Sequence, residues 1–333
     1  MAPRQICTRC VMDSSVPQIK FDASGECNYC KLHDALSNDN PNDERGKEIL
    51  KQIAEKLKKE GKGKKYDVVV GVSGGTDSTY LLHLCIELGL RPLAVHLDNG
   101  WNTETSVANL RNVLEALDID LYTYVINWDE FRDILLSQLK SGLPWADAPT
   151  DIAIVSTLYR TAIKFDVPNI FVGNNFRTEG KQPTLWTYTD GRLISYIQKK
   201  FGTKKIEPFP NQTIWDVLYF TLIKRVKMVR PFYYIQFNKK HAKKLISEKY
   251  GWKDYGGHHH ENIFTRYIIG VWLNQKFGID KRKVTLSAYI RNGEISRQDA
   301  LKDLQQAPYQ PKLMQSDHEY VAKKLGISLS EFN

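Results

Sequence analysis

The feature that most constrains the fold is an alternation of apolar, β-branched runs with helical patterns between residues 67 and 173. The expected strands are residues 67–72, 92–97, 121–126 and 169–173, and the expected helices are residues 77–88, 103–117, 128–140 and 151–165. Strands that are apolar on both faces are typical of parallel sheets covered by helices on each side. The sequence therefore predicts an α/β fold with a doubly wound parallel sheet, whose ligands bind beyond the carboxyl ends of the strands.

A glycine-rich turn, Gly71-Val-Ser-Gly-Gly-Thr-Asp-Ser78, joins the first expected strand to its helix. This arrangement favours an anion site, because the N–H groups of a first helical turn have no partner within the helix. Gly74 and Gly75 let the backbone approach an anion closely. Ser73, Thr76 and Ser78 add hydroxyl groups, so the turn is interpreted as a phosphate loop.

Two other phosphate motifs fit the turn less well. No Gly-Lys-Ser or Gly-Lys-Thr sequence is present, which excludes the Walker loop of γ-phosphate transfer. A dinucleotide site would place glycine where Ser73 stands. Asp98, at the end of the second expected strand, does resemble a ribose-binding acid, so the dinucleotide alternative stays open.

Four of the five cysteines form two matched pairs, Cys7-x-x-Cys10 and Cys27-x-x-Cys30. This spacing is typical of a zinc ribbon, in which four thiolates around a structural Zn²⁺ organise a segment too poor in apolar residues to fold by burial alone. The polar stretch 34–43 is expected to be a loop. The fifth cysteine, Cys85, continues an apolar helix surface and is interpreted as a core residue.

The rest of the chain divides by composition and periodicity. We expect a zinc ribbon at residues 1–43, a helix and linker at 44–64, a sheet domain with the phosphate loop at 65–190, a basic and partly helical segment at 191–250 and a helical region at 251–333. In the last region, Ser296-x-x-Asp299 and Ser316-x-x-Glu319 each predict the start of a helix.

The net charge of +9 comes mainly from one segment. Residues 192–249 hold fourteen lysines or arginines against three acids, a pattern that attracts RNA, an anionic membrane or a sugar diphosphate and that also fits a solvated surface. The sequence contains no apolar stretch long enough for a membrane span and no leader-like start, so a cytoplasmic protein is expected. The apolar stretch 213–228 is open between a buried helix, a partner surface and a membrane-surface segment.

The sequence Ser73-Gly-Gly-Thr-Asp-Ser78 resembles the signature of the PP-loop, or N-type, ATP pyrophosphatases, a superfamily with the adenine nucleotide alpha hydrolase-like fold. The resemblance implies that ATP is split between its α and β phosphates while the loop holds the departing pyrophosphate. It implies that Asp77 positions Mg²⁺ and that Ser73 and Asp77 act in the chemistry. The ATP-binding residues that it implies are Gly71, Ser73, Gly74, Gly75, Thr76, Asp77, Ser78, His96, Asp98, Asn99 and Asn174.

The block from Gly251 to Arg266, with residues 276–283 and Ser287, is similar to the carboxyl-terminal part of the N-acetyl sugar amidotransferases, the WbpG and PseA-like enzymes of surface-polysaccharide synthesis. The resemblance implies conversion of an acetamido group of a nucleotide-linked sugar to an acetamidino group, with AMP and pyrophosphate released. It implies that a HisH-like glutaminase and a HisF-like channelling subunit deliver the ammonia. It implies substrate contacts from His258, His259, His260, Glu261, Arg266, Lys276, Lys281 and Arg282, with Arg266 foremost.

Two alternatives remain. A PP-loop enzyme that modifies tRNA would use the zinc ribbon and the basic segment to hold RNA, although the match to the sugar enzymes makes nucleic acid the weaker expectation. A non-catalytic scaffold that only senses ATP is the other. The sequence alone does not name the sugar, its nucleotide carrier or the amidated position.

Overall fold

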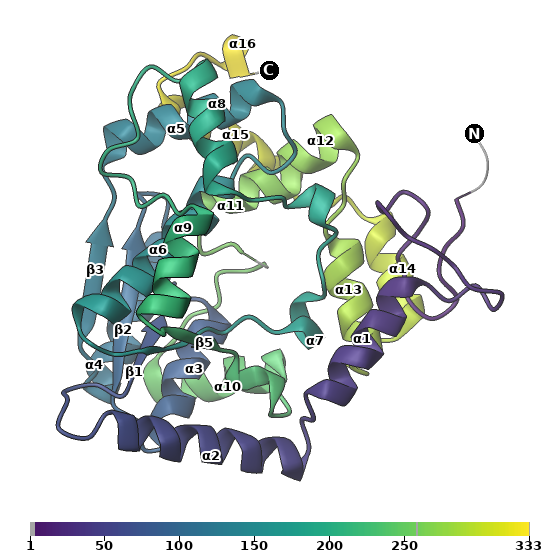
Figure 1. Ribbon diagram of the computed structural model, residues 1–333. Helices are drawn as coiled ribbons and strands as arrows, with labels where there is room; N and C mark the ends of the chain where they lie inside the picture. The colour runs from purple at the N-terminus through teal and green to yellow at the C-terminus, as the bar shows by residue number, and fades with distance from the viewer. Residues whose placement is uncertain (1–3, 258, 333) are drawn as a thin grey trace.

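A five-stranded parallel sheet forms the centre of the protein, whose computed structural model describes residues 4–257 and 259–332 (Figure 1). The strand order is β3-β2-β1-β4-β5, which places β1 in the middle. The strands are β1 (Val68–Gly71), β2 (Pro92–Asp98), β3 (Leu121–Val125), β4 (Asn169–Phe171) and β5 (Lys227–Val229). The doubly wound parallel sheet expected from the alternating pattern is therefore confirmed.

Helices cover both faces of this sheet. Val68 and Val70 of β1 point to one face, where they pack in a cluster with Leu81 and Leu110. Val69 points to the other face and packs with Leu158. Leu81 belongs to α3 (Thr76–Glu87), Leu110 to α4 (Glu104–Leu117) and Leu158 to α6 (Ala148–Lys164). Burial on both faces explains why β1 is a continuous run of valines.

The remaining helices extend the sheet region at both ends of the chain. Before β1 lie α1 (Asn28–Asp39) and α2 (Glu44–Glu60). Between β3 and β5 lie α5 (Trp128–Ser141), α7 (Phe176–Glu179), η1 (Thr184–Trp186), α8 (Gly191–Phe201), α9 (Ile214–Leu218) and η2 (Tyr219–Ile223). After β5 come η3 (Pro231–Tyr233), α10 (Lys239–Tyr250), α11 (Ile263–Tyr267), η4 (Ile268–Trp272), α12 (Leu273–Phe277), α13 (Arg282–Arg291), α14 (Arg297–Gln305), α15 (Pro311–Leu325) and α16 (Leu329–Phe332). None of the described helices has both the length and the apolar character needed to cross a bilayer.

Three expectations about local structure are corrected. Residues 34–39 belong to α1 and are not a loop, because the helix that starts after Cys27 continues through them. Ser296 caps α14 as expected, but Ser316 lies inside α15, which begins at a proline instead. The sheet also extends beyond residue 190, where the expected ATP-binding domain ended, because β5 comes from the basic segment and pairs with β4.

The apolar stretch 213–228 is not a buried helix. It forms α9 and the π-helical turn η2, in which Phe220 is buried and stacks on Tyr159. The opposite side carries an exposed stripe that includes Trp215, at 76% exposure, and Ile223, at 70%. The stripe consists of Ile214, Trp215, Leu218, Tyr219, Leu222 and Ile223. Two of the three expected roles, a partner surface and a membrane surface, therefore stay open.

The four paired cysteines meet in a buried cluster at the amino-terminal end of the chain. Their Sγ atoms all lie within 4.8 Å of one another, and none forms a disulfide. Neighbouring Sγ atoms are separated by 3.9 Å (Cys7 to Cys30), 3.7 Å (Cys10 to Cys27) and 3.6 Å (Cys27 to Cys30). Four thiolates at about 2.3 Å from one tetrahedral ion would be about 3.8 Å apart. The cluster thus fits a single metal ion.

Arginines of the carboxyl-terminal region hold this cluster in place. Arg291 donates from Nε to Cys30 Sγ at 3.2 Å, and Arg297 donates to the carbonyl oxygens of Cys7 and Cys10. Four thiolates around a divalent ion carry net negative charge, which a guanidinium compensates. Figure 1 shows the result: the amino-terminal cysteine segment and α1 lie beside α13 and α14, which come from the carboxyl-terminal part of the chain.

We predict that the full-length protein purified from cells carries one tightly bound metal ion. Stripping it with a chelator, or changing Cys27→Ser, should lower the midpoint of thermal unfolding by on the order of 10 °C, because metal binding contributes to folding. Elemental analysis and thermal unfolding measure the two effects. The matched control is Cys85→Ser, which lies outside the cluster and should keep the metal. A metal-free native protein whose midpoint is insensitive to chelation would contradict the prediction.

Candidate functional site

The glycine-rich turn lies where β1 ends and α3 begins, at the carboxyl edge of the sheet. Gly75 occupies the N-cap of α3, so the first N–H groups of the helix face the space above the turn. Within the turn, the Ser73 hydroxyl accepts from the N–H of Gly75, and the Ser78 hydroxyl accepts from the N–H of Ser73. The turn is a preformed cradle for an anion.

Gly74 is required at its position by both its backbone and its surroundings. Its φ is +75°, and a Cβ there would lie 2.0 Å from the carbonyl oxygen of Ser106 in α4. The indole of Trp252 donates to the Gly74 carbonyl at 3.0 Å. The turn is therefore fixed from two sides, by α4 and by a segment of the carboxyl-terminal region.

This covering segment, residues 252–257 and 259–262, lies across the phosphate loop. The side chain of Asn109 on α4 exchanges two hydrogen bonds of 2.8 Å with the backbone of Lys253. At the other end, the carbonyl of Glu261 accepts from the N–H of Thr103 and from the Ser106 hydroxyl. Between these anchors, the Tyr255 hydroxyl accepts from the N–H of Thr76 at 3.2 Å. The covering segment thus contacts the first turn of α3 directly.

A cluster of charged groups surrounds the start of α3. Lys239 lies 3.0 Å from Asp77 Oδ2, while Asp77 Oδ1 is buried and has no hydrogen-bond partner among the described residues. Glu179, at the end of α7, is close enough that burial first, and then the charge of Asp77, raise the pKa of its carboxyl. Burial opposes the charge on Lys239, but the adjacent carboxylates, Asp77 foremost, hold its pKa above the ordinary value. This part of the site has an excess of negative charge.

A second cluster of charged side chains, formed by Asp147, Asp151 and Lys281, lies near the first cluster. The pKa of Asp147 is raised to about 7 by burial and by Asp151, and that of Lys281 is lowered to about 8 by burial. Lys281 Nζ lies 4.1 Å from the centre of the Trp145 ring, and the Trp145 indole donates to Asp151 at 2.7 Å. Glu179 acts electrostatically on both Lys239 and Lys281, so both ammonium groups lie near Glu179.

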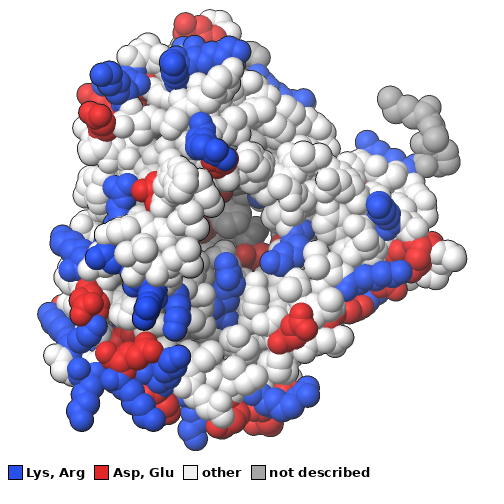
Figure 2. All heavy atoms as spheres, viewed as in Figure 1, with Lys and Arg blue, Asp and Glu red and all other residues white. Residues whose placement is uncertain are grey.

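The space around these charged groups is a recess in the middle of the molecule, which we call the central hollow. The side chain of Asp151 is exposed, yet desolvation is the largest cause of the rise in its pKa. This combination is expected for a carboxyl group on the wall of a deep recess. Figure 2 shows the surface hollowed near its centre, with acidic and basic side chains beside the recess. The described residues around the hollow are Asp77, Asp147, Asp151, Glu179, Lys239, Tyr255, Glu261, Lys281 and Tyr289.

The residues of the hollow fit a magnesium-bound polyphosphate. Asp77 Oδ1 and Glu261 Oε2 are both buried without a partner among the described residues, and carboxylate oxygens are ligands that Mg²⁺ accepts. A divalent cation beside Asp77 and Glu179 would also relieve the repulsion between them. The N–H groups of the loop and the ammonium of Lys239 would then contact the phosphate oxygens.

The structure places the expected nucleotide residues in two classes. All residues from Ser73 to Ser78 belong to the cradle. His96 and Asn99 are buried and serve the fold: His96 Nδ1 bonds the Val72 carbonyl, and Asn99 accepts from Trp101 and Asn262. Asp98 caps the turn at Gly100. Asn174 follows β4 and donates to Glu179, which places it beside the hollow.

The expected substrate residues are also divided. Glu261 and Lys281 lie at the hollow, and His259 lies 3.7 Å from Glu261. His260 packs against Tyr309, and burial lowers its pKa. His258 falls outside the described residues. Lys276 is exposed and lies over the Trp272 ring.

Two of the expected arginines have structural partners instead. Arg266 makes two hydrogen bonds of 2.7 and 2.6 Å to Asp317, which tie α11 to α15. Arg282 pairs with Asp280 and also bonds Asp303 and two carbonyls. Because these guanidinium groups already have carboxylate partners, the expectation that Arg266 and Arg282 bind substrate is not supported by the geometry.

Sequence reasoning missed six residues of the hollow: Asp147, Asp151, Glu179, Lys239, Tyr255 and Tyr289. The best available signal was that Glu179 follows the end of β4, as the phosphate loop follows β1. The others come from segments that only the tertiary fold brings to the loop.

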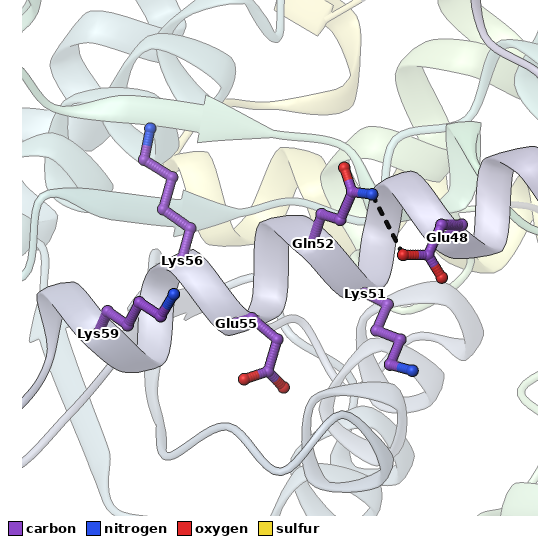
Figure 3. A pocket seen from close by; sticks show the side chains of 6 residues that line it. All are labelled: Glu48, Lys51, Gln52, Glu55, Lys56 and Lys59. Carbon is purple, nitrogen blue, oxygen red and sulfur yellow. Dashed lines mark hydrogen bonds between the residues drawn. The ribbon is translucent and has the colours of Figure 1, made fainter.

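The described surface also has shallow depressions elsewhere. One lies on α2 and is lined by Glu48, Lys51, Gln52, Glu55, Lys56 and Lys59 (Figure 3). These side chains project from a single exposed helix face, and Gln52 bonds Glu48 within it. The depression has none of the buried, unpartnered polar atoms that distinguish the central hollow.

We predict that Asp147 gives the protein a distinctive dependence of stability on pH. Its carboxyl keeps a proton to about pH 7 in the folded chain but ionises near 3.8 when unfolded. Between these values the folded state binds more protons, so this group lowers stability as pH rises through that window. From pH 5 to pH 8, the unfolding free energy of the natural chain should fall by about 3 kcal/mol more than that of Asp147→Asn. Denaturant unfolding at several pH values measures this, with the exposed Asp129→Asn as control; parallel profiles for the natural chain and Asp147→Asn would refute it.

Two protein families match parts of the chain. The family described as LPS biosynthesis protein WbpG-like, C-terminal domain, matches residues 261–333, and the NAD synthase family matches residues 46–141. The second match includes the phosphate loop, β1, β2 and α3. Comparison with curated proteins finds no match.

Several solved structures are similar to the chain at low identity. NH3-dependent NAD synthetase from Campylobacter jejuni has 13% identity and a TM-score of 0.36, and the match covers 85% of this chain and 97% of that one. NMN synthetase from Francisella tularensis has 17% identity and a TM-score of 0.31, with coverage of 70% and 94%. The U34-tRNA thiolase NcsA from Methanococcus maripaludis, with its [4Fe-4S] cluster, has 15% identity and a TM-score of 0.35, with coverage of 97% and 88%.

The assignment of this chain accordingly rests on the two family matches and on the site. A NAD synthase-type phosphate loop and a WbpG-like carboxyl-terminal domain occur in one polypeptide, and the covering segment that leads into that domain contacts the loop. Both point to an ATP-using enzyme of the amidating or ligase kind. The chain is a WbpG-like member of the PP-loop proteins.

Proposed function

We propose that this chain is the synthetase subunit of a sugar amidotransferase. In this proposal it uses ATP to convert the acetamido group of a nucleotide-linked or otherwise activated N-acetyl sugar to an acetamidino group, and it releases AMP and pyrophosphate. The match of residues 261–333 to a family described by lipopolysaccharide biosynthesis supports a role in O-antigen or surface-glycan synthesis.

One observation carries the proposal: the phosphate loop and the region next to the WbpG-like domain enclose the same hollow. Tyr255 contacts the first turn of α3, and Glu261 lies over Gly75. A sugar held by the carboxyl-terminal wall would therefore lie beside the α-phosphate of an ATP whose terminal phosphates rest on the loop.

The chain's own residues account for the first half of the reaction. The N–H groups at the start of α3 and the ammonium of Lys239 receive the pyrophosphate portion of ATP. Mg²⁺, held by Asp77 and Glu179, would neutralise the phosphates when bound. The acetamido oxygen attacks the α-phosphorus, the bond from that phosphorus to the bridging oxygen breaks, and pyrophosphate leaves with the electron pair. The amide oxygen has thereby become part of a phosphate ester, which is a good leaving group.

The second half replaces this oxygen with nitrogen. Ammonia attacks the activated carbon, the carbon–oxygen bond breaks, and AMP leaves with the bonding electrons. Ammonia is mostly ammonium at neutral pH, so a base must take its proton before it attacks. Asp151, exposed in the hollow, and Asp147, whose pKa is raised to about 7, provide carboxyl groups with a suitable proton affinity.

The ammonia is proposed to come from a separate HisH-like glutaminase through a HisF-like subunit. A glutaminase of the cysteine type needs an accessible, activated thiol. Of the described cysteines, four form the metal cluster, and Cys85 is fully buried with a raised pKa. The exposed apolar stripe on α9 and η2 provides a surface on which such a subunit could dock.

Zinc is the proposed metal of the cysteine cluster. Sγ separations of 3.6–3.9 Å suit one tetrahedral ion, and four cysteine ligands leave no open position for catalysis. Its proposed role is structural.

The proposal predicts that ATP is consumed only to AMP and pyrophosphate. Incubated with ATP, Mg²⁺, ammonium and UDP- or CMP-linked acetamido sugars, the enzyme should yield a product slightly lighter than its substrate, because NH replaces O. Ser73→Ala and Asp77→Asn should each reduce turnover by about 10² to 10³-fold, since both alter the cradle for the charge that develops. Mass spectrometry and nucleotide chromatography measure these outcomes, with the exposed Asp129→Asn as control. ADP and orthophosphate as products would refute the proposal.

The alternative of a tRNA-modifying enzyme has one supporting observation, the exposed lysines and arginines of residues 199–230. Purified protein that retains RNA, with binding that falls steeply as salt rises, would favour that alternative. Amidination of a sugar in the absence of RNA would exclude it as the main activity.

A further inference from the structure

The phosphate loop already has a partner within the chain, and that partner is Tyr255. The N–H of Thr76, in the first turn of α3, donates to the Tyr255 hydroxyl at 3.2 Å. The N–H of Gly75 donates to Ser73, and the Gly74 carbonyl accepts from Trp252. The N–H groups of Gly75 and Thr76 therefore already have partners within the chain.

The Tyr255 hydroxyl occupies the space that an anion would need. Gly75 leaves that space open, since a Cβ there would lie 3.1 Å from both the Tyr255 oxygen and the Ser73 oxygen. An oxygen of pyrophosphate that accepts the N–H of Thr76 would lie at the same point as the phenol oxygen. The phenol oxygen and the pyrophosphate oxygen cannot occupy this point at the same time.

The phenol is a replaceable partner. Burial first, and then the carboxylate of Glu261, raise the pKa of Tyr255, so its oxygen is neutral near pH 7. A neutral oxygen accepts a weaker hydrogen bond than a charged phosphate oxygen does. The exchange of phenol for phosphate at Thr76 is thus favourable once the nucleotide arrives.

The covering segment is built so that Tyr255 can move while its ends stay fixed. Lys253 and Glu261 are anchored to α4 and to Thr103 by hydrogen bonds on either side. Gly256 follows Tyr255 directly, with a φ of +104° that favours glycine, and Gly257 comes next. Displacement of the phenol would therefore be confined to the middle of this segment, whose far end carries His259 and Glu261.

We propose that Tyr255 closes the phosphate site of the free enzyme and that the pyrophosphate portion of ATP displaces it, which rearranges the wall of the hollow that faces the second substrate. This inference rests on the ATP-binding part of the proposed function and does not depend on the sugar. It assigns Tyr255 a gating role and makes ATP the first substrate to bind.

The test is the binding of magnesium pyrophosphate to the full-length protein, measured by isothermal titration calorimetry. Tyr255→Phe removes the hydroxyl but keeps the ring, so the affinity should rise about fivefold, because a hydrogen bond no longer has to be broken. Tyr250→Phe is the matched control, since it also loses one hydrogen bond, to His83 on α3, but lies outside the phosphate loop. Its affinity should equal that of the natural chain.

An unchanged or weaker affinity in Tyr255→Phe would overturn the inference, since a weaker one would make the hydroxyl a phosphate ligand. Failure of both proteins to bind pyrophosphate would overturn the ATP-binding assignment as well. Tighter binding together with no sugar amidination would leave the gate standing and remove only the proposed substrate.

Hydrogen exchange measured by mass spectrometry gives a second readout that a purely structural tyrosine would not affect. In the natural chain, pyrophosphate should slow exchange in the loop and speed it in the peptide around Tyr255. Tyr255→Leu should show fast exchange in that peptide before any ligand is added. Slower exchange there after pyrophosphate binds would contradict displacement.

Discussion

The backbone of Gly74 lies against the carbonyl of Ser106, and this contact sets the position of the phosphate loop relative to α4. The same helix, with the residues just before it, also anchors the covering segment through Asn109, Thr103 and Ser106. The phosphate loop and the covering segment are thereby held by one element. Any side chain at position 74 would push both apart, so the requirement for glycine extends beyond the loop itself.

Electrostatics gives the hollow its chemical character. Several carboxyl groups line it, while Lys239 and Lys281 are its described ammonium groups, so the carboxyl groups outnumber the ammonium groups. A bare polyphosphate would be repelled, whereas a polyphosphate with a divalent cation would complete the charge balance. The opposite wall carries Asp147 and Asp151 together with Lys281.

The parts of this architecture that depend on local sequence could be predicted. The alternating strands, the glycine turn and the paired cysteines each follow from neighbouring residues, and all were found where the sequence placed them. Lys239 and Tyr255 could not be predicted, because the fold brings them to the loop from more than a hundred residues away. The pairing of Arg266 could not be predicted for the same reason: its partner Asp317 is 51 residues distant. The exposure of α9 and η2 also depends on tertiary packing, since only the stacking of Phe220 on Tyr159 decides which side faces inward.

Helix α13 connects the central hollow to the cysteine cluster. It begins next to Lys281 at the hollow and ends with Arg291 at the cysteine cluster, and on the way Lys283 makes a buried ion pair with Asp13 and Ser287 accepts from the N–H of Val11. Deleting the amino-terminal module would leave a buried lysine without its carboxylate and would free the helix that forms one wall of the site. The amino-terminal module therefore cannot be removed without disturbing the site. Replacing it with the corresponding module of a relative would succeed only if α13 were replaced as well.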